Sequence, residues 1–331
     1  MKKILMATLI TLLASVCVSG FGPATAQAAD MKPVELKIWS AWIPDTFSTD
    51  PFMHMFNDMV NEKGKAVNLS IKFIGGPEVF KAFDGIEALR KGLVDVAYTA
   101  SVYHTGTVPE ARALILSQLT PMEERETGAY DLIDKFHREK AGIHYLCRLG
   151  LQPYFNFYMN KELDKVDFTG LKLRSTPAYD HIIKHLGGAI IRTQMSEVYT
   201  ALERGTIDGY GFPTLGIADH KLEEVTKYVW GPAFYSSPTS LFINLAKWDN
   251  LAEEQRAVLT EAAKELEIKS TEMFADYVKK DRELLAKTGV EIYKLSPEDE
   301  QALLEITNKT GWDMLLEKAP DAAPLKPLMS K

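Results

Sequence analysis

Cysteine is scarce in this sequence, which has Cys17 and Cys147 among its 331 residues. Cys17 lies in an apolar N-terminal run that we expect to be removed, so the processed chain would keep a single cysteine and no intrachain disulfide. Cys147 lies in the apolar run Ile143-His-Tyr-Leu-Cys147. This setting predicts a buried, unreactive thiol rather than a nucleophile, and stability must come from the hydrophobic core.

Motifs of the common enzyme classes are also missing. The sequence has no glycine-rich phosphate loop, no H-E-x-x-H and no G-x-S-x-G. His181 and His185 are four residues apart, but a third ligand is not evident, so we do not expect a metal site. We therefore expect no catalytic residues, no metal and no cofactor. The sequence is typical of a binding protein rather than an enzyme.

Strong positive charge is absent as well. Lysine and arginine number 38 against 45 acidic residues, the net charge is −7, and no basic run occurs, so we expect no nucleic-acid partner. By contrast, 46% of the residues are apolar, with 15 Phe, 13 Tyr and 5 Trp. That supply of core residues excludes an intrinsically disordered chain, and the length suggests two lobes or one large domain. We expect a monomer.

The N-terminus resembles a secretory signal peptide. Lys2 and Lys3 precede an apolar stretch that runs from Ile4 to about Phe21, and a small-residue motif follows at 26–28. We expect residues 1–29 to form the signal peptide, with cleavage after Ala28 or Ala29. An uncleaved membrane anchor is the alternative, because the run approaches the ~18 residues that span a bilayer. No second apolar span follows residue 30, which predicts a soluble protein in the periplasm.

Alternating strand and helix patterns predict an α/β fold. The phrase Ala88-Leu-Arg-Lys-Gly-Leu-Val-Asp95 recurs as Ala201-Leu-Glu-Arg-Gly-Thr-Ile-Asp208, in each case at the end of a helical pattern and the start of a strand. Two similar halves of this kind suggest two lobes with a cleft between them. The elements that carry this prediction are strands over 36–39, 68–74, 94–99 and 170–174 and helices over 51–63, 79–91 and 181–186.

The C-terminal third is strongly helical. Residues 251–287 contain neither Pro nor Gly, and a helix of that length spans ~55 Å, enough to brace both lobes. Ser296 and Pro297 are typical of an N-cap and a first helical position. We expect the tail from Pro320 to be loose.

One arginine and a set of aromatic residues are the candidate ligand contacts. Arg174 ends the predicted strand 170–174, and residues at the carboxyl ends of strands line the crevice in open α/β sheets. The planar guanidinium matches a carboxylate bidentately, although an ordinary surface arginine remains the alternative. In the strand 154–158, alternation sends Tyr154, Asn156 and Tyr158 to one face and Phe155 and Phe157 to the other.

The chain resembles the extracytoplasmic solute receptors of TRAP transporters, the DctP family. The resemblance covers the whole mature chain and rests on three segments in order: Ile86-Glu-Ala-Leu-Arg-Lys-Gly-Leu-Val-Asp95, Gly170-Leu-Lys-Leu-Arg174 and the stretch 195–209. It implies two α/β lobes of the periplasmic binding protein fold, hinge strands and a long helix across both lobes. Residues 30–150 would form lobe I with about 237–275, and residues 151–236 would form lobe II with about 276–331.

The resemblance also implies that Arg174 is the carboxylate-binding arginine and that a membrane permease is the partner. Sugar-acid-binding members carry a second arginine where this chain has Tyr154, and an asparagine where it has Phe212. These two differences predict an organic monocarboxylate that is aromatic or otherwise poorly hydroxylated. A small keto or hydroxy acid is the runner-up, and a ligand sensor for a signalling partner is the other alternative. The predicted ligand-binding residues are Arg174, Tyr154, Phe212, Trp39, Trp42, Tyr210, Glu78 and Phe234.

Overall fold

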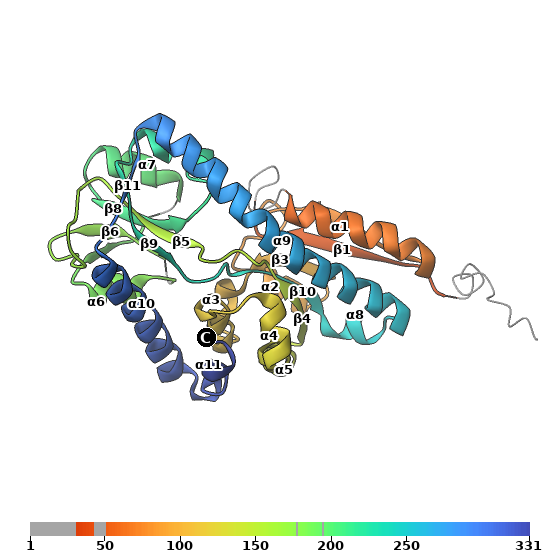
Figure 1. Cartoon of the computed structure of the whole chain (residues 1–331). Helices are drawn as coiled ribbons and strands as arrows, with labels where there is room; N and C mark the ends of the chain where they lie inside the picture. Colours follow the sequence, from red (N-terminus) through yellow and green to blue (C-terminus); the bar gives the residue numbers. More distant parts are fainter. Residues whose placement is uncertain (1–30, 43–50, 177, 194) are drawn as a thin grey trace, which may run out of the picture.

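The computed structural model describes residues 31–42, 51–176, 178–193 and 195–331. The expected signal peptide and its cleavage site therefore lie outside the described residues. Two β-sheets lie at opposite ends of an elongated molecule (Figure 1), and each is flanked by helices. The expectation of an α/β fold with two lobes is confirmed.

The first sheet belongs to lobe I and has the strand order β2-β1-β3-β10-β4. Strand β1 pairs in parallel with β2 and β3, whereas β10 pairs antiparallel with β3 and β4. The carboxyl ends of β1, β2 and β3 therefore meet at one edge. Its strands are β1 (Val34–Ser40), β2 (Leu69–Gly75), β3 (Val96–Ala100), β4 (Ile143–Arg148) and β10 (Thr239–Asn244).

The second sheet belongs to lobe II and has the order β11-β9-β5-β8-β6-β7. The chain enters it through residues 149–154, which link β4 to β5, and leaves it through residues 235–238, which link β9 to β10. We refer to these two crossing segments as the hinge. The strands of lobe II are β5 (Phe155–Met159), β6 (Lys172–Arg174), β7 (Ala189–Ile191), β8 (Gly209–Pro213), β9 (Tyr228–Phe234) and β11 (Glu291–Tyr293).

Helix α9 (Glu253–Thr288) runs along both lobes, as expected (Figure 1). Its 36 residues span about 54 Å. It packs on α1 and β4 in lobe I and reaches the turn at Leu222–Glu224 in lobe II. The other helices are α1 (Phe52–Lys63), α2 (Gly85–Arg90), α3 (Ala113–Leu116), α4 (Pro121–Thr127), α5 (Ala129–Ala141), α6 (Asp180–His185), α7 (Val198–Glu203), α8 (Leu245–Asp249), α10 (Pro297–Lys318) and α11 (Leu325–Leu328).

Two local expectations are wrong. The C-terminal tail is ordered, because Thr127 Oγ1 donates a hydrogen bond to the Leu328 carbonyl at 2.8 Å and Gln118 N donates to Met329 O at 2.8 Å. The helix expected over 79–91 begins only at Gly85, and the preceding residues form turns. The apolar residues Val79 and Phe83 have helical spacing, but they are exposed rather than directed into a core.

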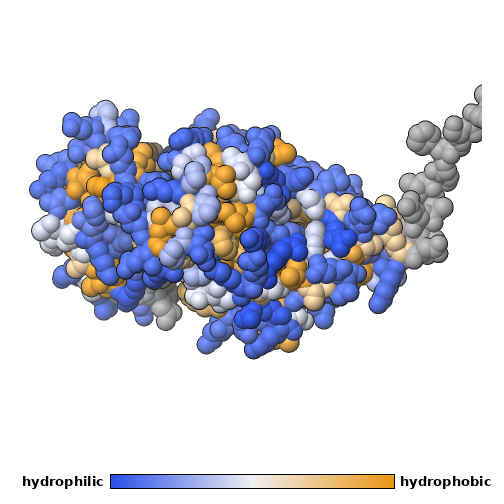
Figure 2. Space-filling view, turned by 90° about the horizontal axis from the view of Figure 1, so that it is seen from below, coloured by the Kyte–Doolittle hydropathy of each residue, from blue (hydrophilic) through white to orange (hydrophobic). Residues whose placement is uncertain are grey.

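Most other sequence expectations hold. Ser296 Oγ accepts a hydrogen bond from Asp299 N, and Pro297 is the first residue of α10. Cys147 is fully buried, and burial raises the pKa of its thiol. The face of the molecule in Figure 2 is mostly hydrophilic with small hydrophobic patches. Within the described residues, no helix is both long and apolar enough to cross a bilayer.

Candidate ligand-binding site

Arg174 is the last residue of β6, where it pairs with Tyr210 of β8 and Ile191 of β7. Its side chain lies at the carboxyl end of the strand, as expected, and only 8% of the residue is exposed. Within the described part of the chain, its guanidinium donates two long hydrogen bonds, each of 3.4 Å, to Thr193 O and to the Tyr179 hydroxyl. Both acceptors are neutral. A guanidinium has five N–H donors, so this arrangement keeps capacity for a bidentate carboxylate.

Tyr179 positions the guanidinium of Arg174 and was not found by sequence reasoning. Its hydroxyl donates to Gly211 O at 2.5 Å, and its ring covers Gly211. A Cβ at Gly211 would lie 2.4 Å from the ring, so glycine is required for this close approach. Burial raises the pKa of the Tyr179 phenol, and Arg174 opposes this rise. The only sequence signal was its position five residues after Arg174, at the start of the next helix.

Tyr103 is a lobe I residue that is linked electrostatically to Tyr179 and Arg174 of lobe II. It follows β3 in a 3₁₀ turn at Ser101–His104 and is half-buried. Burial raises the pKa of its phenol, Tyr179 raises that pKa further, and Arg174 lowers it. The phenol of Tyr103 therefore lies within electrostatic range of two lobe II side chains. Sequence reasoning also missed this residue, although its place just beyond the carboxyl end of a strand is a signal for a crevice residue.

Two of the predicted residues, Tyr154 and Phe234, lie where the hinge segments cross. Tyr154 N donates to Tyr235 O at 2.8 Å, and the Tyr154 side chain is 5% exposed. Burial and then Tyr103 raise the pKa of the Tyr154 phenol, and a hydrogen bond with Ser237 lowers it. Phe234 is 2% exposed and packs in the core of lobe II, with its ring 5.3 Å from that of Phe157. The phenol of Tyr154 is therefore linked electrostatically to that of Tyr103.

Tyr210 and Phe212 lie on the opposite face of β8 from Gly211 and Tyr179. The ring of Tyr210 stacks on Tyr158 at 5.2 Å, and its hydroxyl is 2.8 Å from that of Thr226. Phe212 is half-buried against Tyr158 and Tyr210 in the same small cluster. Their ligand role stays a prediction, but the structure does not place these two rings beside Tyr179.

The expected alternation of strand 154–158 is confirmed by its contacts. The rings of Phe155 and Phe157 contact Tyr179 and Phe234 on one face. On the other face, the Tyr158 hydroxyl donates to Pro213 O at 2.9 Å, and Asn156 accepts a hydrogen bond from Thr214. One face of the lobe II sheet therefore carries Phe155, Phe157 and Tyr179, and the other carries Tyr158 and Tyr210. Arg174 is in register with Tyr210 at the end of β6, and its guanidinium reaches the Tyr179 hydroxyl.

The three predicted lobe I residues differ in their surroundings. Trp39 is fully buried and donates from Nε1 to Gly76 O at 2.8 Å, whereas the half-buried Trp42 packs edge-on against Tyr98 at 5.2 Å. Glu78 is exposed, and its carboxylate accepts a hydrogen bond from Gly76 N at 2.7 Å, which lowers its pKa. Trp39 and Glu78 thus hold the backbone beyond β2. Trp42 instead packs against β3 through its contact with Tyr98.

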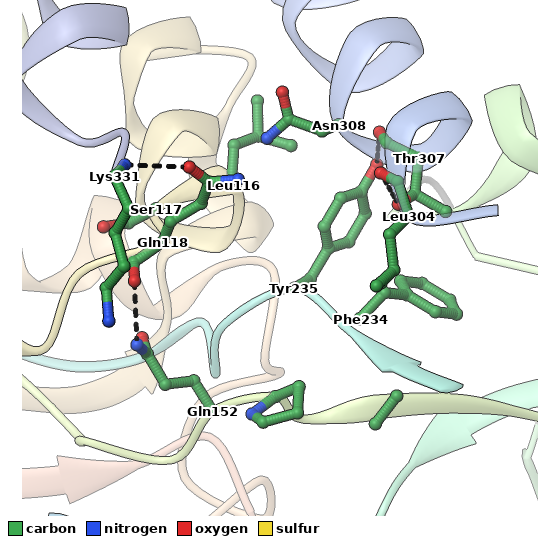
Figure 3. A pocket seen from close by; sticks show the side chains of 12 residues that line it. Leu116, Ser117, Gln118, Gln152, Phe234, Tyr235, Leu304, Thr307, Asn308 and Lys331 are labelled. Atoms are coloured by element: carbon green, nitrogen blue, oxygen red, sulfur yellow. Dashed lines mark hydrogen bonds between the residues drawn. The ribbon is translucent and has the colours of Figure 1, made fainter. Parts of the chain in front are cut away.

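A pocket of about 440 Å³ opens at the hinge (Figure 3), and Arg174 is not among the residues that line it. Lobe I contributes the 116–118 segment, the hinge contributes Gln152, β9 contributes Phe234, and α10 contributes Thr307 and Asn308. Tyr235 donates from its hydroxyl to Thr307 O at 2.7 Å across one wall. Phe234 is the only predicted ligand-binding residue among the lining residues.

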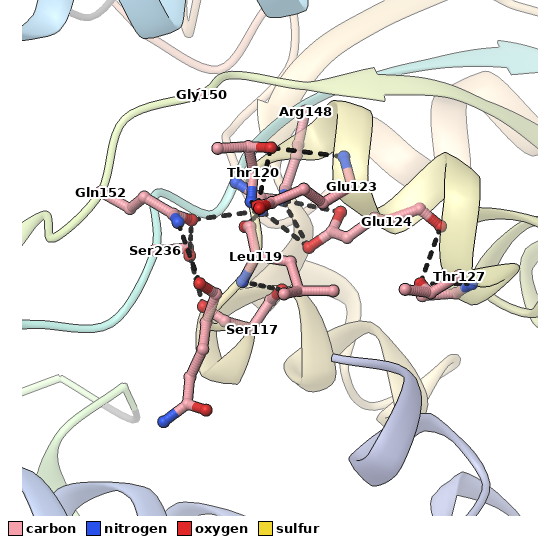
Figure 4. A network of polar contacts seen from close by, with 12 residues as sticks. Ser117, Leu119, Thr120, Glu123, Glu124, Thr127, Arg148, Gly150, Gln152 and Ser236 are labelled. Carbon is pink, nitrogen blue, oxygen red and sulfur yellow. Dashed lines mark hydrogen bonds and ion pairs between the residues drawn. The ribbon is translucent and has the colours of Figure 1, made fainter. Parts of the chain in front are cut away.

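A buried polar network fixes the hinge to lobe I (Figure 4). Arg148 Nη2 donates to Glu124 Oε1 at 2.7 Å and to Leu119 O at 2.6 Å. Gln152 Oε1 accepts from Arg148 at 3.3 Å and from Ser236 Oγ at 2.7 Å. Both crossing segments are therefore tied to the loop that precedes α4.

No metal centre emerges from the described residues. They contain no group of three or more His, Cys, Asp or Glu side chains that could hold an ion. His181 is instead 2.7 Å from the Tyr235 hydroxyl, and burial, then Arg112, lowers its pKa to about 4. His185 is exposed. The helix α6 thus uses His181 as a polar contact to the hinge.

Several known proteins are similar to this chain in sequence or in fold. The 2,3-diketo-L-gulonate-binding periplasmic protein YiaO of Escherichia coli (strain K12) is 26% identical over 82% of this chain and 84% of its own length. A TRAP periplasmic solute binding protein from Desulfovibrio desulfuricans, solved with bound sn-glycerol-3-phosphate, superimposes with a TM-score of 0.76. It is 23% identical, over 89% of this chain and 96% of that chain.

A third similar protein is DctP7 of Bordetella pertussis, an extracytoplasmic solute receptor binding pyroglutamic acid. Its structure matches with a TM-score of 0.74 and 20% identity, over 89% of this chain and 99% of that chain. The model of the DctP family, described as bacterial extracellular solute-binding protein family 7, matches residues 41–317. The family and these neighbours are solute receptors rather than enzymes. The chain therefore belongs to the DctP family of bacterial extracellular solute-binding proteins.

Proposed function

We propose that this protein is the periplasmic receptor of a TRAP transporter for an organic monocarboxylate, with Arg174 as the carboxylate anchor. The observation that carries the proposal is that the Arg174 side chain is nearly buried and has no anionic partner among the described residues. It is 8% exposed, yet both of its acceptors in the described residues are neutral oxygens at 3.4 Å. A nearly buried guanidinium gains most from an anionic partner with two parallel acceptors, which is what a carboxylate supplies.

The names of similar proteins support an acidic ligand. YiaO is named for 2,3-diketo-L-gulonate and DctP7 for pyroglutamic acid. Each of these compounds carries a single carboxylate group. Because these relatives are 26% and 20% identical to this chain, they support the class of ligand rather than a particular acid.

Aromatic residues around Arg174 favour a poorly hydroxylated acid. Tyr103, Tyr154 and Tyr179 interact with one another or with Arg174, and Tyr154 stands where sugar-acid-binding members carry an arginine. Ligand pockets of this composition offer apolar ring surface with few polar groups. We therefore propose an aromatic or otherwise poorly hydroxylated acid.

A small keto or hydroxy acid is the second candidate, and one observation favours it. At the carboxyl end of β3, the buried hydroxyls of Tyr98, Thr99 and Ser101 have no hydrogen-bond partner among the described residues. Buried hydroxyls usually have a partner. Tyr98 and Thr99 are consecutive in β3 and point to opposite faces, so one ligand would not reach both. A keto or hydroxyl oxygen beside the carboxylate would satisfy one of the three hydroxyls.

Lobe closure is the proposed mechanism. The lobes are proposed to divide near residues 150 and 236, and the hinge would bring Tyr103 toward the carboxylate held by Arg174. Closure would expel water and strengthen the ion pair, because charges interact more strongly away from solvent. The closed receptor would then deliver the acid to a membrane permease driven by an ion gradient.

A thermal-shift screen of the signal-less protein tests this function. The probes are aromatic, keto, hydroxy, sugar and dicarboxylic acids, each on wild type and Arg174→Ala. An acid at about 100 times its Kd stabilises the protein by about 2.7 kcal/mol and raises Tm by about 5–10 °C. We expect a monocarboxylate to give this shift and Arg174→Ala to abolish it. A shift that survives in Arg174→Ala would contradict the anchor, and a response to dicarboxylic acids alone would contradict the ligand class.

A further inference from the structure

Phe83 is unusually exposed for an aromatic residue. It is 68% exposed, the largest value among the large hydrophobic side chains of the described residues. It lies between β2 and α2, in the turns that replace the first half of the expected helix. Exposed large apolar groups of this kind mark ligand or partner sites when a second feature accompanies them.

The second feature is the contact with Tyr103. The two ring centroids are 4.7 Å apart with an interplanar angle of 50°, so Phe83 covers one side of the Tyr103 ring. Tyr103 in turn interacts electrostatically with Arg174 and Tyr179 of lobe II. Phe83 therefore packs on the lobe I ring that is linked electrostatically to Arg174, the proposed carboxylate anchor.

The backbone beneath Phe83 is held rigidly. Trp39 Nε1 donates to Gly76 O at 2.8 Å, and Glu78 accepts from Gly76 N at 2.7 Å. The Trp39 ring also packs against Gly85, where a Cβ would lie 2.1 Å from the ring. At the turn itself, Asp84 N donates to Lys81 O at 2.9 Å. An exposed ring on a fixed turn loses little conformational freedom when a ligand contacts it, which suits a recognition residue.

We infer that Phe83, with Tyr103 behind it, is a specificity-determining residue that stacks on the organic part of the acid held by Arg174. The selected ligands are acids with an aromatic ring next to the carboxylate head, and polyhydroxy acids are disfavoured because their hydroxyls would be desolvated against the Phe83 ring. This inference rests on the proposed function and names the ligand class within it.

Phenylpyruvate and pyruvate form a matched pair of probes, because they share the same keto-acid head and differ by one aryl ring. Calorimetric titration of wild type, Phe83→Ala and Phe83→Tyr measures both acids. We expect Phe83→Ala to bind phenylpyruvate about fivefold more weakly and pyruvate unchanged, within about twofold. Phe83→Tyr keeps the ring and should keep the wild-type affinity ratio.

Leu93→Ala is the matched control, because Leu93 is a 58% exposed hydrophobic residue of lobe I in the turn after α2. It should leave both affinities unchanged. A wild type that binds no aromatic acid, or a Phe83→Ala variant that weakens both acids equally or neither, overturns the inference. The variant Arg174→Ala distinguishes a failure of the proposed function from a failure of the inference about Phe83. If it loses both acids while the Phe83→Ala ratio is unchanged, the proposed function stands and this inference fails; if it keeps both, the proposed function itself fails.

Discussion

Two nearly buried arginines at the ends of strands have opposite surroundings. Arg148, at the end of β4, is fully buried and pairs with Glu124, which is also buried. Arg174, at the end of β6, has two neutral acceptors at 3.4 Å. Position at a strand end is therefore not sufficient to identify a ligand arginine. The difference lies in whether the fold itself supplies the carboxylate, as it does for Arg148.

This contrast predicts that substitution of Arg148 lowers the stability of the protein, whereas substitution of Arg174 weakens ligand binding. Arg148→Met leaves the Glu124 carboxylate buried without a cation, so the free energy of unfolding should fall by about 3–5 kcal/mol. Urea denaturation followed by circular dichroism measures the loss. The double variant Arg148→Met/Glu124→Leu removes both charges and should recover much of it. A double variant as unstable as the single one would contradict this account of the pair.

Two buried histidines of lobe I, His104 and His137, extend the comparison of buried groups with and without a charged partner. Neither forms an ion pair with a carboxylate among the described residues. His104 Nε2 and His137 Nε2 are 3.0 Å apart, and His137 Nδ1 is 2.8 Å from Ile133 O. Burial lowers the pKa of His137 to about 4 and that of His104 well below its usual range, although Asp134 and Glu110 partly oppose the shift of His137.

Both histidines have a lower pKa in the folded state than in the unfolded chain. Protonation therefore favours unfolding, and stability should fall as pH drops below about 6.5, down to about pH 4 where His137 itself titrates. Each histidine contributes up to about 1.4 kcal/mol per pH unit. Urea titrations at pH 7, 6 and 5 measure the slope. His137→Gln should flatten it, whereas His185→Gln, at an exposed residue, should not. An unchanged slope in His137→Gln would rule out this origin.

The smallest expected effect concerns the contact between Trp39 and Gly85, which supports the turn that carries Phe83. Gly85→Ala places a methyl group 2.1 Å from the Trp39 ring, so we expect a loss of about 1–3 kcal/mol in unfolding free energy. Gly106→Ala, where a Cβ meets no atom within 4 Å, is the control. Equal stabilities of the two variants would show that the turn around Phe83 yields easily and is not held by Trp39.

The sequence was a good guide where structure depends on local pattern. The helix α9, the N-cap at Ser296 and the place of Arg174 at a strand end follow from periodicity and capping chemistry. The turn before α2 did not, because its apolar spacing mimics a helix while Trp39, far away in sequence, holds it in another conformation. The ordered tail likewise depends on distant partners such as Gln118.

The candidate site was predicted only in part for the same reason. Arg174 could be found from its position, but its neighbours Tyr103 and Tyr179 are brought together by the packing of the two lobes. Tyr210 and Phe212 looked equivalent to them in the sequence, yet alternation along β8 places both on the face opposite Tyr179, where Tyr210 is the register partner of Arg174. A run of aromatic residues does not reveal which rings the folded chain brings together.

The most direct test of the central claim combines a change in the ligand with a change in Arg174. Calorimetry compares the acid that gives the largest thermal shift with its primary amide, on wild type and on Arg174→Ala. If the guanidinium pairs with the carboxylate, wild type should prefer the acid by about 2–5 kcal/mol, and Arg174→Ala should show almost no preference. The same preference for the acid in both proteins would contradict the assignment of Arg174 as the anchor.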